Sequence, residues 1–376
     1  MRVLVTGGAG FIGSWLVESL LEAGHVVTVL DSLSAQIHGE LPGATPTWIR
    51  HPNSRFKRGD VRDTALMEEL LGECDAVAHL AAETGTGQSM YQIAHYYDVN
   101  LNATARLLEI IAKRHRQVRK VVLASSRSIY GEGAYEIDGR RVVPAPRTQA
   151  QLQSGRWEML HTDGQPLRLV ATPESTVPRP ASVYAATKLA MEQLAEVVAE
   201  AYGIDIVALR FQNVYGERQS LNNPYTGILS IFSNRMRQGL PINIFEDGKE
   251  SRDFVHVTDV VRAIRLTLER QGSGFRAINI GSGKPTSVMD IAAALRSLLG
   301  SSSELKVTGD FRVGDIRHCY ADLALARTEL GFSPEVSLDD GLARFVHWVR
   351  GQTVGADRSQ QAQAELIALG LGRASQ

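Results

Sequence analysis

The sequence contains little cysteine, no excess of charge and no long apolar run. Its 376 residues include two cysteines, Cys74 and Cys319, too few for a disulfide framework or a clustered metal site. Lys and Arg number 40 against 41 Asp and Glu, a balance that gives no sign of a polyanionic partner. No apolar run reaches membrane-spanning length, and no signal-peptide pattern follows Met1. We therefore expect a cytoplasmic protein with no metal, no nucleic-acid partner and no membrane partner.

Short apolar runs alternate with segments of helical spacing in the first half of the chain. The apolar runs cover residues 3–6, 26–30, 76–80, 121–125 and 206–210, and the helical segments cover 13–23, 65–71, 101–113 and 184–202. Alternation of this kind predicts an α/β fold, in which helices cover a doubly wound parallel sheet of the Rossmann type.

The length of the chain predicts two packed lobes, because a single hydrophobic core stops growing at about 250–300 residues. We expect a Rossmann domain over 1–212, which part of 250–265 rejoins. A smaller, mixed α/β substrate lobe should cover 213–350, followed by a tail over 351–376. Residues 133–180 are rich in Pro, Gly, Arg and Gln without a sustained period, which indicates an inserted surface element.

A glycine-rich turn, TGGAGFIG at residues 6–13, follows the first predicted strand and opens a predicted helix. In a dinucleotide-binding turn, Gly7 permits the sharp bend, Gly10 lets the backbone approach a pyrophosphate, and Gly13 lets helix and strand pack closely. The expected cofactor contacts from this turn are Gly7, Gly10, Phe11, Ile12 and Gly13.

Polar and small residues stand at the ends of the following predicted strands. Asp31 ends the second strand, where a carboxylate accepts hydrogen bonds from the adenosine ribose and repels a ribose phosphate. The sequence therefore favours NAD over NADP. The further expected cofactor contacts are Asp60, Val61, Leu80, Ala81 and Ala82.

Tyr184 and Lys188 are four residues apart, so they share one face of a predicted helix. A phenol has an unperturbed pKa of about 10, and a neighbouring ammonium favours the phenolate. We expect Lys188 to lower the pKa of Tyr184 in this way. Ser125 and Ser126 stand upstream at a strand end, where a hydroxyl can hold a reacting substrate oxygen near Tyr184.

These motifs occur in the order TGGAGFIG, GDVRD, HLAA, SSRSIYGEG, YAATK, LRFQNVYG, RDFVHVTDV and NIGSGKPTSV. Over about residues 1–350 the chain resembles the extended short-chain dehydrogenases/reductases, specifically the NAD-dependent nucleotide-sugar epimerase/dehydratase family. The resemblance implies that Ser126, Tyr184 and Lys188 are catalytic and that Tyr184 and Lys188 also contact the cofactor. Asn100 resembles an asparagine that orders the cofactor site near Lys188.

The same resemblance suggests where a nucleotide-diphosphate sugar binds. Asn213 matches an asparagine that contacts the diphosphate, and Arg252 and Arg312 match two arginines that grip it. Asp315 matches a carboxylate that binds the nucleoside ribose. Ser89, in the ETGTGQSM run, resembles a residue of the hexose pocket.

The residue after Ser126 bears on the reaction. Members that eliminate water or decarboxylate carry an acid at this position, whereas this chain has Arg127, so the resemblance favours a 4-epimerase. The AAETGTGQSMY and ASSRSIYGEG runs look most like dTDP-L-rhamnose 4-epimerases, and a UDP-hexose stays open as substrate. Some relatives carry a cysteine pair in the insertion, but Glu158–Gly164 has none, and this departure supports the expectation of no metal.

Two other functions remain open from the sequence. A nucleotide-sugar 4-keto reductase would consume a reduced cofactor, and a catalytically silent NAD-binding sensor or scaffold would turn over no sugar. The helices predicted at 101–113 and 184–202 resemble those of a four-helix dimer interface, so we expect a homodimer.

Overall fold

The computed structural model describes residues 1–39, 47–221, 223, 227–311, 315–354 and 368–369. Within them, seven parallel strands form a large sheet. Their order across the sheet is β13 (Phe275–Ile280), β9 (Asp205–Phe211), β5 (Lys120–Ser126), β4 (Ala76–His79), β1 (Arg2–Thr6), β2 (Val26–Asp31) and β3 (Ser54–Arg58). The expected parallel sheet is confirmed.

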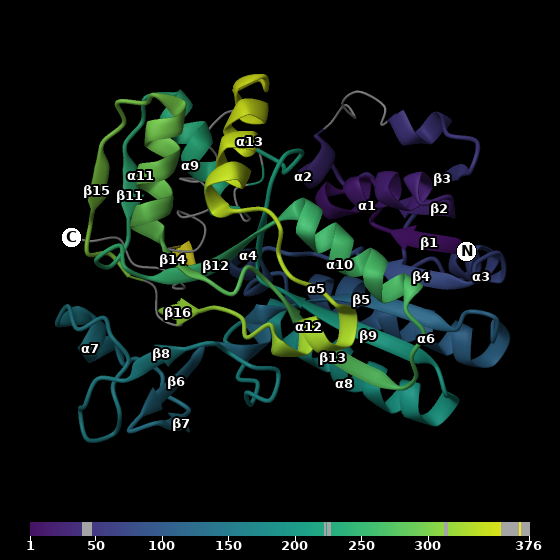
Figure 1. Cartoon of the computed structure of the whole chain (residues 1–376), viewed down its shortest axis with the longest axis horizontal. Coiled ribbons are helices and arrows are strands. Elements are labelled where there is room, and N and C mark those ends of the chain that lie inside the picture. Colours follow the sequence, from purple (N-terminus) through teal and green to yellow (C-terminus); the bar gives the residue numbers. More distant parts are fainter. Residues whose placement is uncertain (40–46, 222, 224–226, 312–314, 355–367, 370–376) are drawn as a thin grey trace.

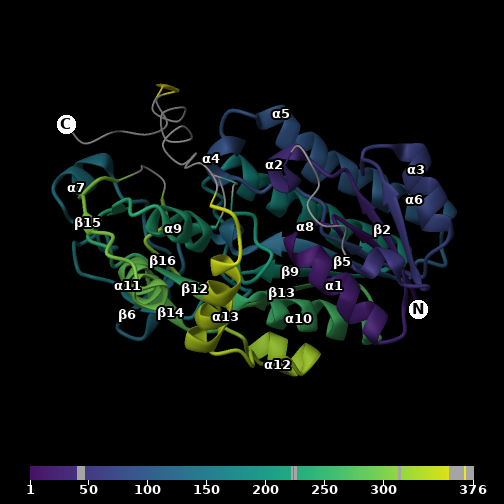
Figure 2. The same ribbon diagram turned by 90° about the horizontal axis from the view of Figure 1, so that it is seen from above.

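Helices cover both faces of this sheet (Figure 2). One face packs against α1 (Phe11–Glu22), α10 (Val257–Glu269) and α12 (Ala324–Leu330), and the other against α3 (Thr64–Gly72), α6 (Ala103–Arg114) and α8 (Val183–Tyr202). Because both faces are buried, the central strands are almost continuously apolar. Leu4 and Val5, for example, are neighbours in β1 that face opposite layers and are both 0% exposed.

We call the smaller lobe the substrate lobe, after the substrate site that the sequence predicts there. It begins with β10 (Asn213–Tyr215). The lobe lies beside the large sheet (Figure 1). Its sheets contain β10, β12 (Ser251–His256), β14 (Pro285–Ser287), β16 (His318–Cys319), β11 (Ile242–Ile244) and β15 (Leu305–Val307), and its helices are α9 (Ile228–Arg237), α11 (Val288–Leu299) and α13 (Leu338–Arg350). Its apolar core is separate from those of the large sheet.

Part of 250–265 returns to the large sheet, and the returning segment extends beyond residue 265. Strand β12 belongs to the smaller lobe, whereas α10 and β13 join the Rossmann domain, which therefore receives residues as far as 280. All six residues of β13 pair in parallel with β9, from Phe275 opposite Ile206 to Ile280 opposite Phe211. This pairing places an extra strand at the edge of the sheet.

The insertion folds as a small antiparallel sheet of β7 (Arg140–Val142), β6 (Ala134–Ile137) and β8 (Arg168–Val170), with α7 (Gln149–Gln153) beside it. It lies against the substrate lobe near β16 (Figure 1). Short elements complete the description: α2 (Ala35–His38), α4 (Thr86–Ser89), α5 (Ile93–Tyr96), and single turns at Thr47–Arg50, Tyr97–Asn102 and Arg127–Tyr130. Most of the expected tail over 351–376 lies outside the described residues.

Candidate active site

A cavity of about 1570 Å³ runs along the carboxyl edge of the large sheet and continues into the substrate lobe. This edge is where open α/β sheets bind ligands. The cavity is lined by most of the residues predicted from the sequence, namely Gly7, Gly10, Phe11, Ile12, Gly13, Asp31, Asp60, Val61, Leu80, Ala81, Ala82, Ser126, Tyr184, Lys188 and Asn213.

The glycine turn leaves no space for a side chain at Gly7 or at Gly13. Gly7 has a φ of +68°, and a Cβ added to it would lie 2.8 Å from the Ala81 nitrogen. A Cβ on Gly13 would lie 2.2 Å from the Gly7 carbonyl oxygen. Helix α1 begins directly after Gly10, so its first N–H groups are available to an anion at the cavity wall.

Asp31 is held at the end of β2 by main-chain donors. Its Oδ2 accepts a hydrogen bond from Ala9 N at 3.0 Å, and its Oδ1 accepts one from Leu33 N at 2.8 Å. Burial alone would raise the pKa of Asp31, but His38 and these two N–H groups lower it overall. The carboxylate is therefore ionised and keeps acceptor capacity for ribose hydroxyls.

Asp60 and Val61 line the cavity in different ways. Asp60 accepts hydrogen bonds from the Arg62 side chain, from Nη2 at 2.8 Å and from Nε at 3.0 Å, and this arginine lowers the pKa of Asp60. Val61 is 7% exposed and also packs in the apolar core of its layer. Cofactor contact by these two residues stays a prediction.

Tyr184 lies in the first turn of α8, where Ser182 caps the helix by accepting a hydrogen bond from Ala185 N at 3.1 Å. Burial raises the pKa of Tyr184, and a hydrogen bond with Ser126 and the charge of Arg127 lower it in part. We expected Lys188 to lower the pKa of Tyr184, but the lowering comes from Ser126 and Arg127 instead. Within the protein alone, burial outweighs the neighbouring cations.

Lys188 is 3% exposed, and its Nζ donates a hydrogen bond to the Ala124 carbonyl at 2.7 Å. The same Nζ lies 5.9 Å from the centroid of the Tyr184 ring. Burial lowers the pKa of Lys188 to about 8, against the opposing effect of Glu192. The ammonium thus stands beside the ring with a main-chain acceptor of its own.

Ser125 and Ser126 have different partners. The Ser125 hydroxyl donates to Glu192, which also pairs with Arg210 in the buried layer beneath the cavity. Ser126 Oγ accepts a hydrogen bond from Ser128 N at 3.2 Å and interacts with the Tyr184 phenol. The geometry therefore favours Ser126 as the partner of Tyr184.

Asn100 and Ser89 do not line the cavity but hold its walls together. Asn100 Nδ2 donates to the Glu83 carbonyl and to Thr187 Oγ1, both at 3.1 Å. Ser89 is 0% exposed, and its Oγ accepts a hydrogen bond from Tyr184 N at 3.0 Å. In this structure both side chains position Tyr184 and the neighbouring turns of α8.

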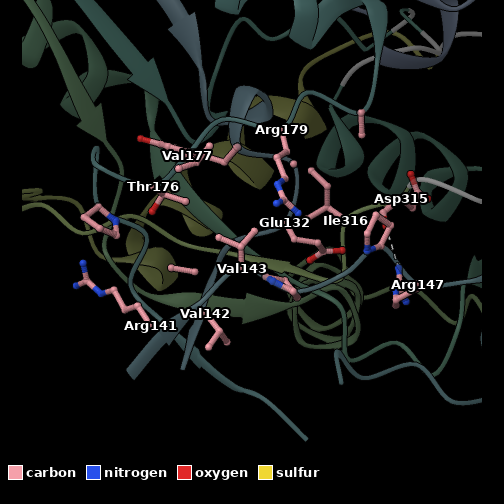
Figure 3. Close-up of a pocket in the computed structure, with 18 of the residues that line it drawn as sticks. Glu132, Arg141, Val142, Val143, Arg147, Thr176, Val177, Arg179, Asp315 and Ile316 are labelled. Atoms are coloured by element: carbon pink, nitrogen blue, oxygen red, sulfur yellow. Dashed lines mark hydrogen bonds between the residues drawn. The ribbon is translucent and has the colours of Figure 1, made fainter. Parts of the chain in front are cut away.

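Two of the predicted substrate residues, Arg252 and Asp315, do not line the large cavity. Arg252 donates to three main-chain carbonyls, those of Ser251, Ile316 and Arg317. Asp315 is exposed and lines a second cavity of about 350 Å³ between the insertion and the substrate lobe (Figure 3). Arg312 lies outside the described residues. Substrate contact by these three residues stays a prediction.

The sequence reading missed Gln212 and left Arg127 without a role. Gln212 is 4% exposed and lines the cavity, yet neither atom of its amide has a hydrogen-bond partner among the described residues. Asn213 Oδ1 and Arg127 Nη1 are likewise buried and unpaired in this part of the chain. The position of Gln212, at the carboxyl end of parallel strand β9, was the available signal.

The model of the NAD dependent epimerase/dehydratase family matches residues 3–150 and 160–281. The chain belongs to this family. A dTDP-L-rhamnose 4-epimerase of Burkholderia thailandensis is 39% identical over 351 residues, which cover 93% of this chain and 94% of the relative. The family assignment agrees with the resemblance drawn from the sequence motifs.

Two solved structures show the same fold. A UDP-N-acetylglucosamine 4-epimerase of Methanobrevibacter ruminantium, in complex with UDP-N-acetylmuramic acid, is 30% identical with a TM-score of 0.75, over 94% of this chain and 99% of that one. A UDP-glucose 4-epimerase of Thermus thermophilus, in complex with NAD, is 30% identical with a TM-score of 0.73, over 94% and 100%.

The cofactor of this epimerase/dehydratase chain is NAD. The residues fit it, because the glycine turn leaves the backbone bare for a pyrophosphate and Asp31 offers an ionised carboxylate to a ribose.

Among the described residues, no group of three or more His, Cys, Asp or Glu side chains could hold a metal ion. The helices of the described ranges are too short or too polar to cross a membrane.

Proposed function

We propose that the protein is an NAD-dependent nucleotide-sugar 4-epimerase. The observation that carries this proposal is the convergence of Ser126, Tyr184 and Lys188 on one cavity with the glycine turn, with an arginine rather than an acid after Ser126. An acid at that position would be needed to move a second proton in an elimination. The 4-epimerases among the relatives and solved structures support the same reaction.

The reaction interconverts two sugars by removing and restoring one hydride. When bound, NAD supplies a reversible hydride acceptor. Tyr184, as phenolate, takes the proton of the sugar's carbon 4 hydroxyl while Ser126 holds that oxygen, and a ketone forms as the hydride leaves carbon 4. After the keto sugar has turned about its diphosphate, Tyr184 returns the proton as the hydride is restored to the opposite face.

Binding energy for this turn must come from the part of the substrate that does not react. Asn213 and Gln212 present unpaired amide atoms on the lobe side of the cavity, where a diphosphate sugar would pass. We assign dTDP-L-rhamnose or a UDP-hexose as substrate, the first on the strength of the Burkholderia relative.

The test is proton NMR of dTDP- and UDP-sugars incubated with purified protein and no added reductant. We expect one sugar to reach an equilibrium mixture with its carbon 4 epimer, with no net change in NAD. Conversion only of a keto sugar, and only with NADH or NADPH, would overturn the epimerase in favour of a reductase. If no sugar is turned over with either cofactor, the catalytically silent NAD-binding sensor or scaffold would be the function that remains.

We propose that the protein is a homodimer that pairs α6 and α8 with their copies. On α8, Val197 is 65% exposed and Tyr202 is 41% exposed, which leaves apolar surface on that helix. Analytical ultracentrifugation should give twice the mass of the chain, and a monomer at micromolar concentration would contradict the proposal. We also propose a cytoplasmic location, with which the two buried free thiols of Cys74 and Cys319 are consistent.

A further inference from the structure

Arg127 stands beside the reacting groups without a partner of its own. It follows Ser126 directly at the end of β5 and lines the large cavity together with Ser126 and Tyr184. Its Nη1 is buried and has no hydrogen-bond partner within the described ranges. A buried donor left unpaired is destabilising by about 1–3 kcal/mol, and a charged one by more. Such a group is expected to meet an acceptor that a ligand or a reaction provides.

The groups around Arg127 do not satisfy it. Arg252, from β12, is a second cation and spends its donors on main-chain carbonyls. The nearby carboxylate of Glu132 already accepts hydrogen bonds from Arg317 N at 2.7 Å and His318 N at 3.2 Å. Cys319, from β16, is a buried thiol.

The remaining neighbour is the phenol of Tyr184, on α8. Arg127 and Tyr184 act on each other electrostatically, and Arg127 and Ser126 oppose the effect of burial on the pKa of the phenol. Lys188, the other cation near that ring, donates to the Ala124 carbonyl instead. Of the cations named here, Arg127 is the one with a buried donor to spare.

We propose that Arg127 is a catalytic residue of this site, whose guanidinium donates a hydrogen bond to the oxygen with which Tyr184 exchanges its proton. This rests on the proposed 4-epimerase function. As the carbon 4 hydroxyl loses its proton to the phenolate and its carbon loses a hydride to NAD, negative charge on either oxygen is met by a fixed positive donor. Arg127 keeps its own protons throughout, so the proton and hydride balance is unchanged.

The effect should be large because the donor is fixed before the reaction begins. In enzymes that stabilise a negatively charged oxygen in the transition state, removing one preorganised hydrogen-bond donor lowers kcat by about 10²–10³-fold. A group that only bound the sugar equally in its ground and transition states would instead raise KM and leave kcat unchanged.

The experiment compares wild type, Arg127→Gln and Arg127→Lys, with Arg141→Gln as the control. Arg141 is an exposed arginine at the second cavity, so its change should leave turnover unaltered. Turnover of the sugar identified by NMR is measured against pH, and bound NAD is measured after denaturation. The absorbance of the Tyr184 phenolate is titrated in each protein against a Tyr184→Phe reference.

For Arg127→Gln we expect kcat to fall about 100-fold. The acid limb of its pH profile and the phenolate titration should both move to higher pH, while NAD content stays the same. Arg127→Lys should keep the titration near that of wild type and recover part of kcat, because it keeps the charge but not the planar fork.

The inference is overturned if Arg127→Gln leaves kcat and the titration unchanged, or if it raises KM alone. It is also overturned if Arg127→Lys shifts the titration as far as Arg127→Gln, because retained charge would then have no effect. If Arg127→Gln does not fold, Arg127→Met takes its place in the kinetic and titration comparisons. A wild type that epimerises no sugar defeats the proposed function instead, and the phenolate titration still reports on Arg127.

Discussion

Among the described residues, buried arginines have ion-pair partners where the insertion meets the substrate lobe, which we call the junction, but not at the reaction site. At the junction, Arg317 is 0% exposed and donates to Asp247 at 2.7 Å and Glu246 at 3.0 Å. Arg147 reaches the same Glu246 at 2.8 Å. At the reaction site, Arg127 has a buried Nη1 with no partner in the described part of the chain.

The difference indicates two roles for a buried arginine: Arg317 and Arg147 hold a segment in place, whereas Arg127 is free to bind a ligand. Arg147 Nη2 also donates to the Asp315 carbonyl at 2.9 Å, so the paired network fixes the segment that leads to β16 (Figure 3). A paired network loses stability when one member is removed, because the partner charge is left buried and alone. An unpaired arginine can be replaced without that loss, and its removal is felt in activity.

Tyr184→Phe should have the largest effect on turnover, and it changes the reaction site alone. Without the phenolic oxygen there is no group to take the carbon 4 proton, so we expect turnover to fall by about 10²–10⁴-fold. Bound NAD and the melting temperature should stay near wild type. Tyr202→Phe is the matched control, because Tyr202 is 41% exposed at the far end of α8. Near wild-type turnover of Tyr184→Phe would remove Tyr184 from the mechanism.

Arg317→Met and Arg127→Met test the comparison directly. Arg317→Met removes the arginine partner of Asp247 and leaves Glu246 with Arg147 as its remaining arginine partner among the described residues, so it should lower the free energy of unfolding by about 3–5 kcal/mol. Arg127→Met breaks no ion pair among the described residues and should leave that free energy unchanged or higher. Urea unfolding of both variants measures this. Equal destabilisation by the two changes would contradict the distinction drawn here.

Gly13→Ala should disturb the cofactor side of the cavity. Its Cβ would stand 2.2 Å from the Gly7 carbonyl oxygen, so α1 and the glycine turn must move apart. We expect a loss of about 1–3 kcal/mol of stability and weaker NAD retention on gel filtration. Gly351→Ala is the control, because its Cβ would make an ordinary contact of 3.5 Å. Full NAD occupancy in Gly13→Ala would show that the turn tolerates the displacement.

The smallest effect is the acid sensitivity of the junction. Hydrogen bonds from His318 and Arg317 lower the pKa of Glu158 to about 2, against burial that would raise it. A lowered folded pKa means that this stability is present at neutral pH and is lost as the pH falls from about 4.5 towards 2. Glu158 is half exposed, so the contribution is small.

Glu158→Gln tests this by melting temperature against pH. The variant should be slightly less stable than wild type at pH 7, and the two should converge at low pH. Glu136→Gln is the control, because Glu136 pairs with Arg168 inside the insertion and away from Arg317. A constant difference between wild type and Glu158→Gln at every pH would exclude the titration of Glu158 as the cause.

The sequence predicted the central strands and their helices well because their signals are local. The apolar runs at 3–6, 26–30, 76–80, 121–125 and 206–210 all became strands of the large sheet. Strand β3, with its polar SRFKR sequence at the sheet edge, gave no such signal. Strand β13 was not predicted for a different reason. It lies in the second half of the chain, and only its pairing with β9 makes it part of the large sheet.

The site was predictable where residue types carry a geometry of their own. The spacing of Tyr184 and Lys188 on a helix, and the glycines before α1, fix local arrangements that the structure reproduces. Contacts across the sheet were not predictable. The influence of Lys188 on the phenol was expected, but Lys188 donates to the Ala124 carbonyl, and Arg127 takes the position that acts on Tyr184.

The sequence by itself determined the family, the parallel sheet and NAD as cofactor, because each depends on short motifs whose residues are close together along the chain. It also predicts Ser126, Tyr184 and Lys188 as catalytic residues, and that role stays a prediction. Tertiary structure alone decided which polar groups have partners. Ser125 turns to Glu192 and Ser126 to Tyr184, although they are neighbours in β5. Successive side chains of a strand point to opposite faces, and what waits on each face comes from distant parts of the chain.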